Sequence, residues 1–223
     1  MDMEQARTNM LERQIHPWGV HDERVLTLMG TLPREDFVPA PWRQQAFADM
    51  EIPLREDATA LAAGCVMLPP RVQARMLQEL RLDGHGKVLH IGTGSGFMAA
   101  LLGRMAQRVI SAELDAELAH CAQENLRRAC VMNVQVCTGD GLYIAHSEGP
   151  FDAIVLSGAV TTVPDALIGQ LNPGGRLFAL VGAAPVMRAT LLQRDASGVI
   201  FTQPWDATVP MLRGALAPEN LAA

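Results

Sequence analysis

The sequence predicts an α/β fold: a mostly parallel, doubly wound sheet with a helical extension at its N-terminus. Short apolar runs alternate with helical segments between residues 87 and 181, and this alternation is typical of parallel strands joined by helices. A glycine-rich loop directly follows the first of these runs and opens a helix. The length of 223 residues fits one domain of this class.

The first third of the chain is predicted to be helical and then irregular. Residues 1–30 carry apolar side chains at helical spacing, and the acidic pair Asp22-Glu23 precedes the second run, as a helix start favours. Prolines recur through residues 31–70, so short strands at best are expected there. Helical spacing resumes over residues 71–82.

The core elements follow in alternation. We expect strands at residues 87–91, 108–113, 133–138, 151–156 and 176–181, and helices at residues 97–105, 116–129 and 164–171. In such sheets the loops that follow the strands meet at one edge, where ligands bind. We therefore expect a single domain, residues 1–223, in which an N-terminal helical and irregular segment (1–83) precedes a ligand-binding core (84–183) and C-terminal strands (184–223).

Composition and charge exclude several classes of protein. Apolar residues make up 49 % of the chain, which is ordinary for a globular protein and not for a disordered one. The net charge is −6 with a single lysine, Lys87, so a nucleic-acid partner is not expected. The longest uncharged apolar stretch, residues 177–187, is too short to span a membrane. Four cysteines without an export signal predict reduced thiols and a cytoplasmic location.

The glycine loop is the clearest ligand signal. Gly92, Gly94 and Gly96 stand between a strand and a helix, where glycine allows a tight turn and the helix start offers free N–H groups. The dinucleotide fingerprint requires a glycine at the position of Phe97, so that pattern fails by register. A tight turn that binds nothing is the plainer alternative.

Two acids follow the next strands. Glu113 ends the second strand, where it can accept hydrogen bonds from a ribose diol, and Asp140 ends the third, within reach of an adenine amine. NAD and S-adenosylmethionine both contain such a ribose, so Glu113 alone does not distinguish them. Each acid has a plainer interpretation, as a solvated strand end or an Asp-Gly turn. Together with the loop they form the pattern of Rossmann-like methyltransferases.

Longer motifs then give a specific resemblance. Pro33-Arg34-Glu35-x-Phe37-Val38-Pro39, Ala46-Phe47-Ala48-Asp49, Val88-Leu89-x-Ile91-Gly92-Thr93-Gly94-Ser95-Gly96, Gly139-Asp140-Gly141 and Val209-Pro210 resemble motifs of the protein-L-isoaspartate O-methyltransferase family. The likeness covers nearly the whole chain. It implies a Rossmann-like methyltransferase fold, S-adenosylmethionine as the cofactor, and transfer of a methyl group to a carboxylate of damaged, isoaspartyl protein or peptide.

The resemblance also implies a set of cofactor-binding residues. The glycine loop would surround the methionine moiety, Glu113 would bind the ribose, and Asp140 with Gly141 would lie near the adenine. The full expected set is His90, Gly92, Thr93, Gly94, Ser95, Gly96, Glu113, Leu114, Asp140, Gly141 and Ser157. Family members carry an acid at His90, and a histidine there can hold the methionine ammonium only as a neutral acceptor. Ser157 is either a hydroxyl at the cofactor's edge or an ordinary strand-end residue.

The acceptor side departs from the family. The family's Thr-x-Ser tripeptide, whose serine is implicated in catalysis, aligns with Val66-Met67-Leu68, so both hydroxyls are missing and no catalytic residue is assigned. Pro53, Leu54 and Leu68 are expected to face the substrate. Ile144 and Ala145 stand where the family has a glycine and an aromatic residue.

Other reactive residues form no recognised pattern. The six histidines lack metal-ligand spacing and no Cys-x-x-Cys occurs, so no metal site is expected. Cys121, Cys130 and Cys137 are predicted to be buried thiols. Cys65, beside the altered tripeptide, is either a thiol exposed near the site or another buried one.

Three classes of function stay open on the sequence. The first is S-adenosylmethionine-dependent methylation of an isoaspartyl carboxylate on protein or peptide. The second is methylation of a different acceptor by the same fold. The third is non-catalytic binding of S-adenosylmethionine. The sequence predicts no oligomeric state.

Overall fold

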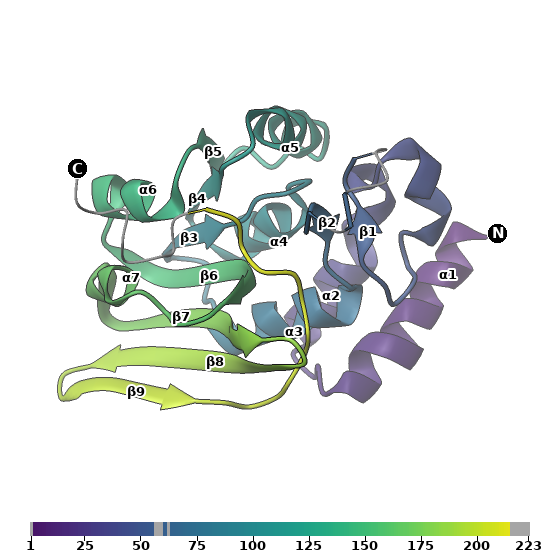
Figure 1. The fold of residues 1–223 in the computed structure, drawn as a ribbon. Helices are drawn as coiled ribbons and strands as arrows, with labels where there is room; N and C mark the ends of the chain where they lie inside the picture. Colours follow the sequence, from purple (N-terminus) through teal and green to yellow (C-terminus); the bar gives the residue numbers. More distant parts are fainter. Residues whose placement is uncertain (1, 56–59, 62, 215–223) are drawn as a thin grey trace.

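A computed structural model of the chain describes residues 2–55, 60–61 and 63–214. Its centre is a seven-stranded sheet in the order β5-β4-β3-β6-β7-β8-β9 (Figure 1). The pairs among β3 to β7 are parallel, and β8 and β9 continue the sheet as antiparallel strands. The strands are β3 (Lys87–Ile91), β4 (Arg108–Glu113), β5 (Val134–Thr138), β6 (Phe151–Val160), β7 (Leu171–Ala183), β8 (Val186–Asp195) and β9 (Gly198–Thr202).

Helices and a small separate sheet complete the fold. The helices are α1 (Met3–Met10), α2 (Glu23–Thr31), α3 (Pro70–Leu80), α4 (Phe97–Met105), α5 (Ala116–Arg128), α6 (Gly141–Glu148) and α7 (Asp165–Gly169). Shorter turns lie at Leu11–Ile15, His16–Trp18, Arg34–Phe37 and Ala40–Gln45. The segment between α2 and α3 also contains an antiparallel pair, β1 (Ile52–Pro53) with β2 (Val66–Met67).

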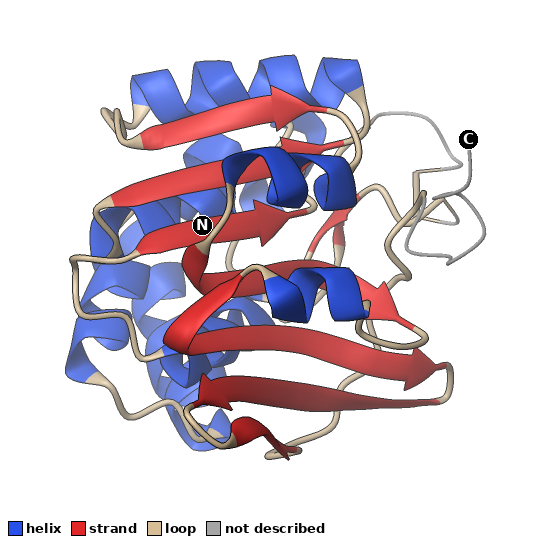
Figure 2. Cartoon of the chain, turned by 90° about the vertical axis from the view of Figure 1, so that its left-hand side faces the viewer, coloured by secondary structure: helices blue, strands red, loops and turns tan. Residues whose placement is uncertain are grey.

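Helices cover both faces of the large sheet (Figure 2). Successive side chains of a strand point to opposite faces, and the core divides accordingly. Val88 and Val155 belong to the cluster formed with α2, α3 and α4. Leu89 and Ile154, their neighbours in sequence, belong to the cluster that contains the apolar side chains of α6 and α7. The central strands are therefore apolar on both faces, as buried parallel strands are.

Aspartates begin several of the helices. The Asp22 carboxylate accepts the Arg24 N–H at 2.9 Å at the start of α2. Asp115 does the same for the first turn of α5, and Asp140 for α6. Such capping satisfies N–H groups that have no partner within the helix. The last two caps also fix the chain where β4 and β5 end.

The chain after β9 returns along the carboxyl edge of the sheet. This segment, drawn in yellow in Figure 1, passes the end of β6. The Ala159 N–H donates to Pro210 O, and the Leu212 N–H donates to Ala159 O, both at 2.8 Å. We call residues 210–213 the edge segment. These two hydrogen bonds hold it over the loops that follow β3 and β4.

Most predicted elements are present with nearly the expected bounds. The strands at 87–91 and 108–113 and the helix at 97–105 match to the residue. One helix, α6, lies where the sequence pattern predicts none, because its apolar residues come first and its polar residues last, so that the eight residues have no clear apolar face. β7 begins at Leu171 rather than at residue 176. Residues 172–175, which contain a proline and two glycines, form an irregularity within the strand rather than a turn before it.

The predicted burial of three cysteines is wrong. Cys121 and Cys130 are exposed, and Cys137 is half-buried. Cys121 lies on the outer side of α5, while Cys137 belongs to β5, which is an edge strand. An edge strand is only partly covered, so apolar character alone does not bury it. No helix among the described residues is long and apolar enough to cross a membrane.

Candidate functional site

A pocket with an empty volume of about 850 Å³, part of it open to solvent, lies at the carboxyl edge of the parallel strands. Its walls come from segments that are far apart in the sequence: the loops after β3, β4 and β5, the end of β6, the β1–β2 segment and the edge segment. The residues expected to bind cofactor or substrate that line it are Leu54, Leu68, Gly92, Gly94, Glu113, Leu114, Asp140, Gly141 and Ser157, and Val66 of the altered tripeptide lines it as well. This edge is where open parallel sheets bind ligands.

The glycine loop needs its glycines for conformation and for space. Gly92 and Gly94 have positive φ values of 91° and 54°, which other residues rarely adopt. A Cβ at Gly94 would lie 3.0 Å from Leu54 Cδ1, across the pocket. Gly96, at φ 89°, precedes α4 and backs onto Ala122 of α5, which a Cβ would approach to 3.2 Å. The loop therefore offers bare backbone to a ligand.

Glu113 is held in place by backbone donors. The Gly94 N–H donates to Glu113 Oε2 at 2.8 Å, and the Asp115 N–H donates to Glu113 Oε1 at 3.1 Å. The side chain is nearly buried but lines the pocket. Each carboxylate oxygen can accept a second hydrogen bond. The carboxylate is thus fixed and still able to bind a diol.

Asp140 caps α6 and also lines the pocket. Its Oδ1 accepts the Leu142 N–H at 2.7 Å as the cap of α6, while its Oδ2 accepts no hydrogen bond from any described residue. Gly141 packs directly on Ile91, whose side chain a Cβ would meet at 2.7 Å. Asp140 therefore presents one carboxylate oxygen to the pocket, and the backbone of Gly141 lies beside it at the pocket wall.

His90 is fully buried behind Ser157, which lines the pocket. Its Nε2 is 2.7 Å from Ser157 Oγ, and its Nδ1 is 2.9 Å from Ser111 Oγ. Ser111 in turn is 2.7 Å from Thr93 Oγ1. Complete burial lowers the pKa of His90 to about 3, so the ring is neutral, with one nitrogen donating and the other accepting. Ser157 faces the pocket, and His90 orients it from behind.

Five residues of the predicted set do not form the pocket's surface. Thr93, Ser95 and Gly96 shape the loop from inside, and the Ser95 carbonyl accepts the Asn125 amide at 2.8 Å. His90 is covered by Ser157, and Pro53 is buried and does not line the pocket. The structure gives these five a supporting position.

The wall of the pocket that the sequence predicts to face the substrate is apolar. Val66 and Leu68 line it with Leu54. The Leu68 carbonyl accepts a hydrogen bond at 2.7 Å from the buried guanidinium of Arg34, which also binds the Ala46 carbonyl at 2.7 Å. Burial lowers the pKa of Arg34 to about 9. The role of Arg34 was not predicted, although its motif was recognised.

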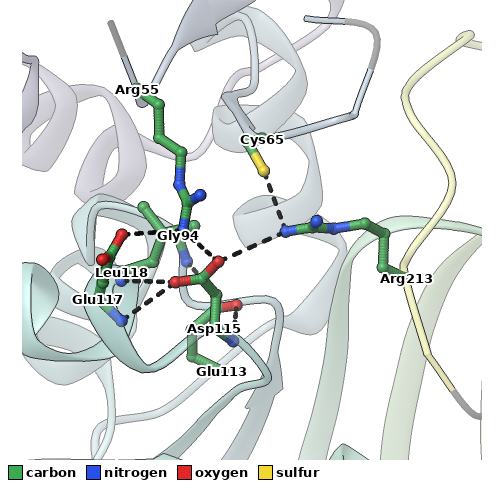
Figure 3. A network of polar contacts seen from close by, with 8 residues as sticks. All are labelled: Arg55, Cys65, Gly94, Glu113, Asp115, Glu117, Leu118 and Arg213. Carbon is green, nitrogen blue, oxygen red and sulfur yellow. Dashed lines mark hydrogen bonds and ion pairs between the residues drawn. The ribbon is translucent and has the colours of Figure 1, made fainter. Parts of the chain in front are cut away.

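A second polar network, also not predicted from the sequence, joins three segments beside the pocket (Figure 3). Arg55 forms a close ion pair with Asp115 and lies 3.2 Å from Glu117. The guanidinium of Arg213 lies 3.0 Å from Cys65 Sγ and 3.9 Å from Asp115 Oδ2. Partial burial acts to raise the pKa of Asp115, but the Leu118 N–H and Arg55 together hold it below its usual value.

Cys65 is buried, yet its sulfur reaches the pocket wall. Among the residues that the structure describes, no three His, Cys, Asp or Glu side chains gather as metal ligands would.

Comparisons with known proteins place the chain in one family. The family model described as protein-L-isoaspartate(D-aspartate) O-methyltransferase matches residues 5–209. A protein-L-isoaspartate O-methyltransferase of Methanoculleus marisnigri is 42 % identical over 176 residues, which are 79 % of this chain and 77 % of that protein. Another, from Koribacter versatilis, is 38 % identical over 192 residues, which are 86 % and 83 % of the two chains.

Solved structures show the same fold. A protein-L-isoaspartate O-methyltransferase superposes with a TM-score of 0.76 at 22 % identity, covering 95 % of this chain and 66 % of that one. A second structure of that name, from Plasmodium falciparum in complex with S-adenosyl-L-homocysteine, gives a TM-score of 0.72 at 17 % identity, with 94 % and 97 % covered. The predicted Rossmann-like methyltransferase fold is therefore confirmed. The family match and these relatives show that the chain belongs to the protein-L-isoaspartate(D-aspartate) O-methyltransferase family of methyltransferases.

Proposed function

We propose that this chain transfers a methyl group from S-adenosylmethionine to a carboxylate of isoaspartyl residues in damaged proteins or peptides. The observation that carries the proposal is Glu113, fixed by the Gly94 and Asp115 N–H groups beside a loop of bare glycine backbone. Family membership supports both the cofactor and the acceptor.

The residues present fit this cofactor. Gly92, Gly94 and Ser157 would hold its methionine moiety, Glu113 its ribose, and Asp140 with Gly141 its adenine. The loop glycines keep their backbone close to the neighbouring segments, since a Cβ at Gly92 or Gly94 would come within 3.0 Å of Leu212 or Leu54. When bound, S-adenosylmethionine supplies a methyl group on a positively charged sulfur, and its transfer to a carboxylate oxygen leaves a methyl ester and a neutral thioether.

The protein's part in this reaction is mainly alignment. A carboxylate with a pKa near ~4 is already ionised at neutral pH, so no general base is required. Leu54, Val66 and Leu68 exclude water from the acceptor side, and Arg34 keeps Leu68 in position from behind. Holding two reacting groups at contact distance accounts for much of the rate enhancement in such reactions.

The hydroxyls missing at Val66 and Leu68 lower the expected rate of methyl transfer. An orienting hydrogen bond contributes on the order of 1–3 kcal/mol, which corresponds to a rate change of about ten- to a hundredfold. Neither Val66 nor Leu68 has a side-chain donor. We therefore expect turnover of isoaspartyl acceptors, at a rate below that of an otherwise identical site with both hydroxyls.

We further propose a division of the single domain. Residues 84–183 hold the cofactor, and residues 1–83 with residues 184–223 shape the acceptor side, since β2 and the edge segment both reach the pocket. The cytoplasmic location stays a prediction from the cysteine content.

Labelled methyl groups test the proposal. The protein is incubated with methyl-labelled S-adenosylmethionine and either an aged, isoaspartate-rich protein or the same protein freshly prepared. We expect base-labile label on the aged sample only, because methyl esters of carboxylates hydrolyse in base. Label that resists base indicates a different acceptor, and cofactor binding without any transfer indicates a non-catalytic role; either result contradicts the proposal.

A further inference from the structure

One charged side chain stands out on the acceptor side of the pocket. Among the described residues that line it, Arg213 is the only cationic side chain. It comes from the edge segment, whose backbone is pinned to Ala159 by two hydrogen bonds of 2.8 Å. Its position is therefore set by the fold and not by a free tail.

Arg213 lies next to the altered tripeptide. Its guanidinium is 3.0 Å from the sulfur of Cys65, the residue directly before Val66 (Figure 3). The side chain is about half exposed, at 51 %. A guanidinium has five donors, and a thiol sulfur is a weak acceptor. As far as the described residues go, most of the hydrogen-bonding capacity of Arg213 is thus available to a ligand in the pocket.

The nearby carboxylate of Asp115 does not form a close ion pair with Arg213. Arg213 is 3.9 Å from Asp115 Oδ2, which is far longer than a charge-assisted hydrogen bond of about 2.7–2.9 Å. Asp115 is already engaged by Arg55 and by the first N–H groups of α5. The pairing of Arg55 with Asp115 leaves Arg213, among the described residues, with this long contact as its one ion pair.

We propose that Arg213 binds the carboxylate of the acceptor and thereby determines its specificity, in place of the hydroxyls that Val66 and Leu68 lack. This inference rests on the proposed function. Guanidinium and carboxylate match in shape and can form two parallel hydrogen bonds. Such a pair fixes the orientation of the carboxylate, as the missing hydroxyls would.

Steady-state kinetics with an isoaspartyl peptide test this role. In Arg213→Gln we expect kcat/KM for the peptide to fall about tenfold, the loss expected for one charge-assisted hydrogen bond, while the KM for S-adenosylmethionine changes by less than about twofold. Arg213→Lys, which keeps the charge, recovers part of the loss. Arg127→Gln is the matched control, because Arg127 is exposed at the far end of α5 and does not line the pocket.

Two results would overturn the proposal. One is an unchanged kcat/KM for the peptide in Arg213→Gln. The other is a rise in the KM for S-adenosylmethionine alone, which would assign Arg213 to the carboxylate of the cofactor. Melting temperatures of the variants, measured by circular dichroism, show whether each is folded.

A binding measurement separates this proposal from the proposed function. Calorimetry in the presence of S-adenosylhomocysteine compares the isoaspartyl peptide with the same peptide bearing a carboxamide at that position. A preference for the carboxylate that disappears in Arg213→Gln supports the role of Arg213, even if the wild-type protein shows no turnover. Equal binding of both peptides by the wild-type protein contradicts it, whether or not turnover occurs.

Discussion

The carboxylate of Glu113, the residue proposed to bind the ribose, is held in a fixed position by the fold. Two backbone N–H groups hold its carboxylate, one from the glycine loop and one from the residue that caps α5. Its position depends on Gly94 and Asp115 as much as on its own strand. A sequence pattern can indicate the acid, but the donors that immobilise it become visible only in the fold.

Replacing Glu113 by glutamine should weaken cofactor binding. The amide group would turn a donor toward a backbone N–H and lose the charge that binds a diol. We expect the affinity for S-adenosylhomocysteine, measured by calorimetry, to fall about ten- to a hundredfold, or ~1.4–2.7 kcal/mol. Glu124→Gln, on the exposed face of α5, serves as the control. Equal affinities in both variants would refute the assignment of the ribose site.

Restoring the missing hydroxyls should increase activity. Val66→Thr with Leu68→Ser places two donors on the apolar wall next to the pocket. We expect kcat/KM for an isoaspartyl peptide to rise about tenfold, the gain from one orienting hydrogen bond. The gain should be largest in the Arg213→Gln background, where no other group orients the carboxylate. A loss of activity in both backgrounds, with the fold intact, would show that this wall does not face the acceptor.

His90 predicts a specific dependence of stability on pH. Its pKa is about 3 in the folded chain and about 6.5 when exposed, so the unfolded chain binds the proton more tightly. The stability contributed by the neutral ring is complete above pH ~6.5 and is lost toward pH ~3, by at most about 1.4 kcal/mol per pH unit. Urea unfolding midpoints of the wild type should therefore fall more steeply over this range than those of His90→Gln. Parallel slopes would mean that His90 is not buried as described.

At the scale of elements, prediction succeeded where one signal was strong. The strand at 87–91 and the helix at 97–105 match because an apolar run, a glycine loop and a second apolar run follow one another without interruption. α6 was missed because its short sequence has no clear apolar face and begins at a glycine. Its start is set by the Asp140 cap, whereas the sequence pattern suggested Asp140 as an adenine ligand or as part of an Asp-Gly turn.

Asp22 provides the test at this scale. Its carboxylate accepts the Arg24 N–H at the start of α2, so Asp22→Ala should lower the free energy of unfolding by about 1 kcal/mol and the melting temperature by roughly 2–4 °C. Asp22→Asn keeps a capping oxygen and should lose much less. If both variants melt alike, the ion pair with Arg24 matters more than the cap.

At the scale of the whole molecule, the site exists only through the topology. The acids and the glycine loop were predictable, because each follows a strand of one parallel sheet. Arg34, Arg55, Asp115 and Arg213 were not, because their partners lie between 12 and 148 positions away in the sequence. The fold brings the edge segment back along the sheet to the end of β6, and no local sequence pattern predicts this contact.

The most direct test of the account compares two synthetic peptides that differ only in one linkage, isoaspartyl or normal aspartyl. Production of S-adenosylhomocysteine from S-adenosylmethionine is measured with each peptide under identical conditions. The account predicts steady turnover with the isoaspartyl peptide and a rate at background with the aspartyl peptide. Equal rates with both peptides, or background rates with both while S-adenosylhomocysteine binds tightly, would contradict it.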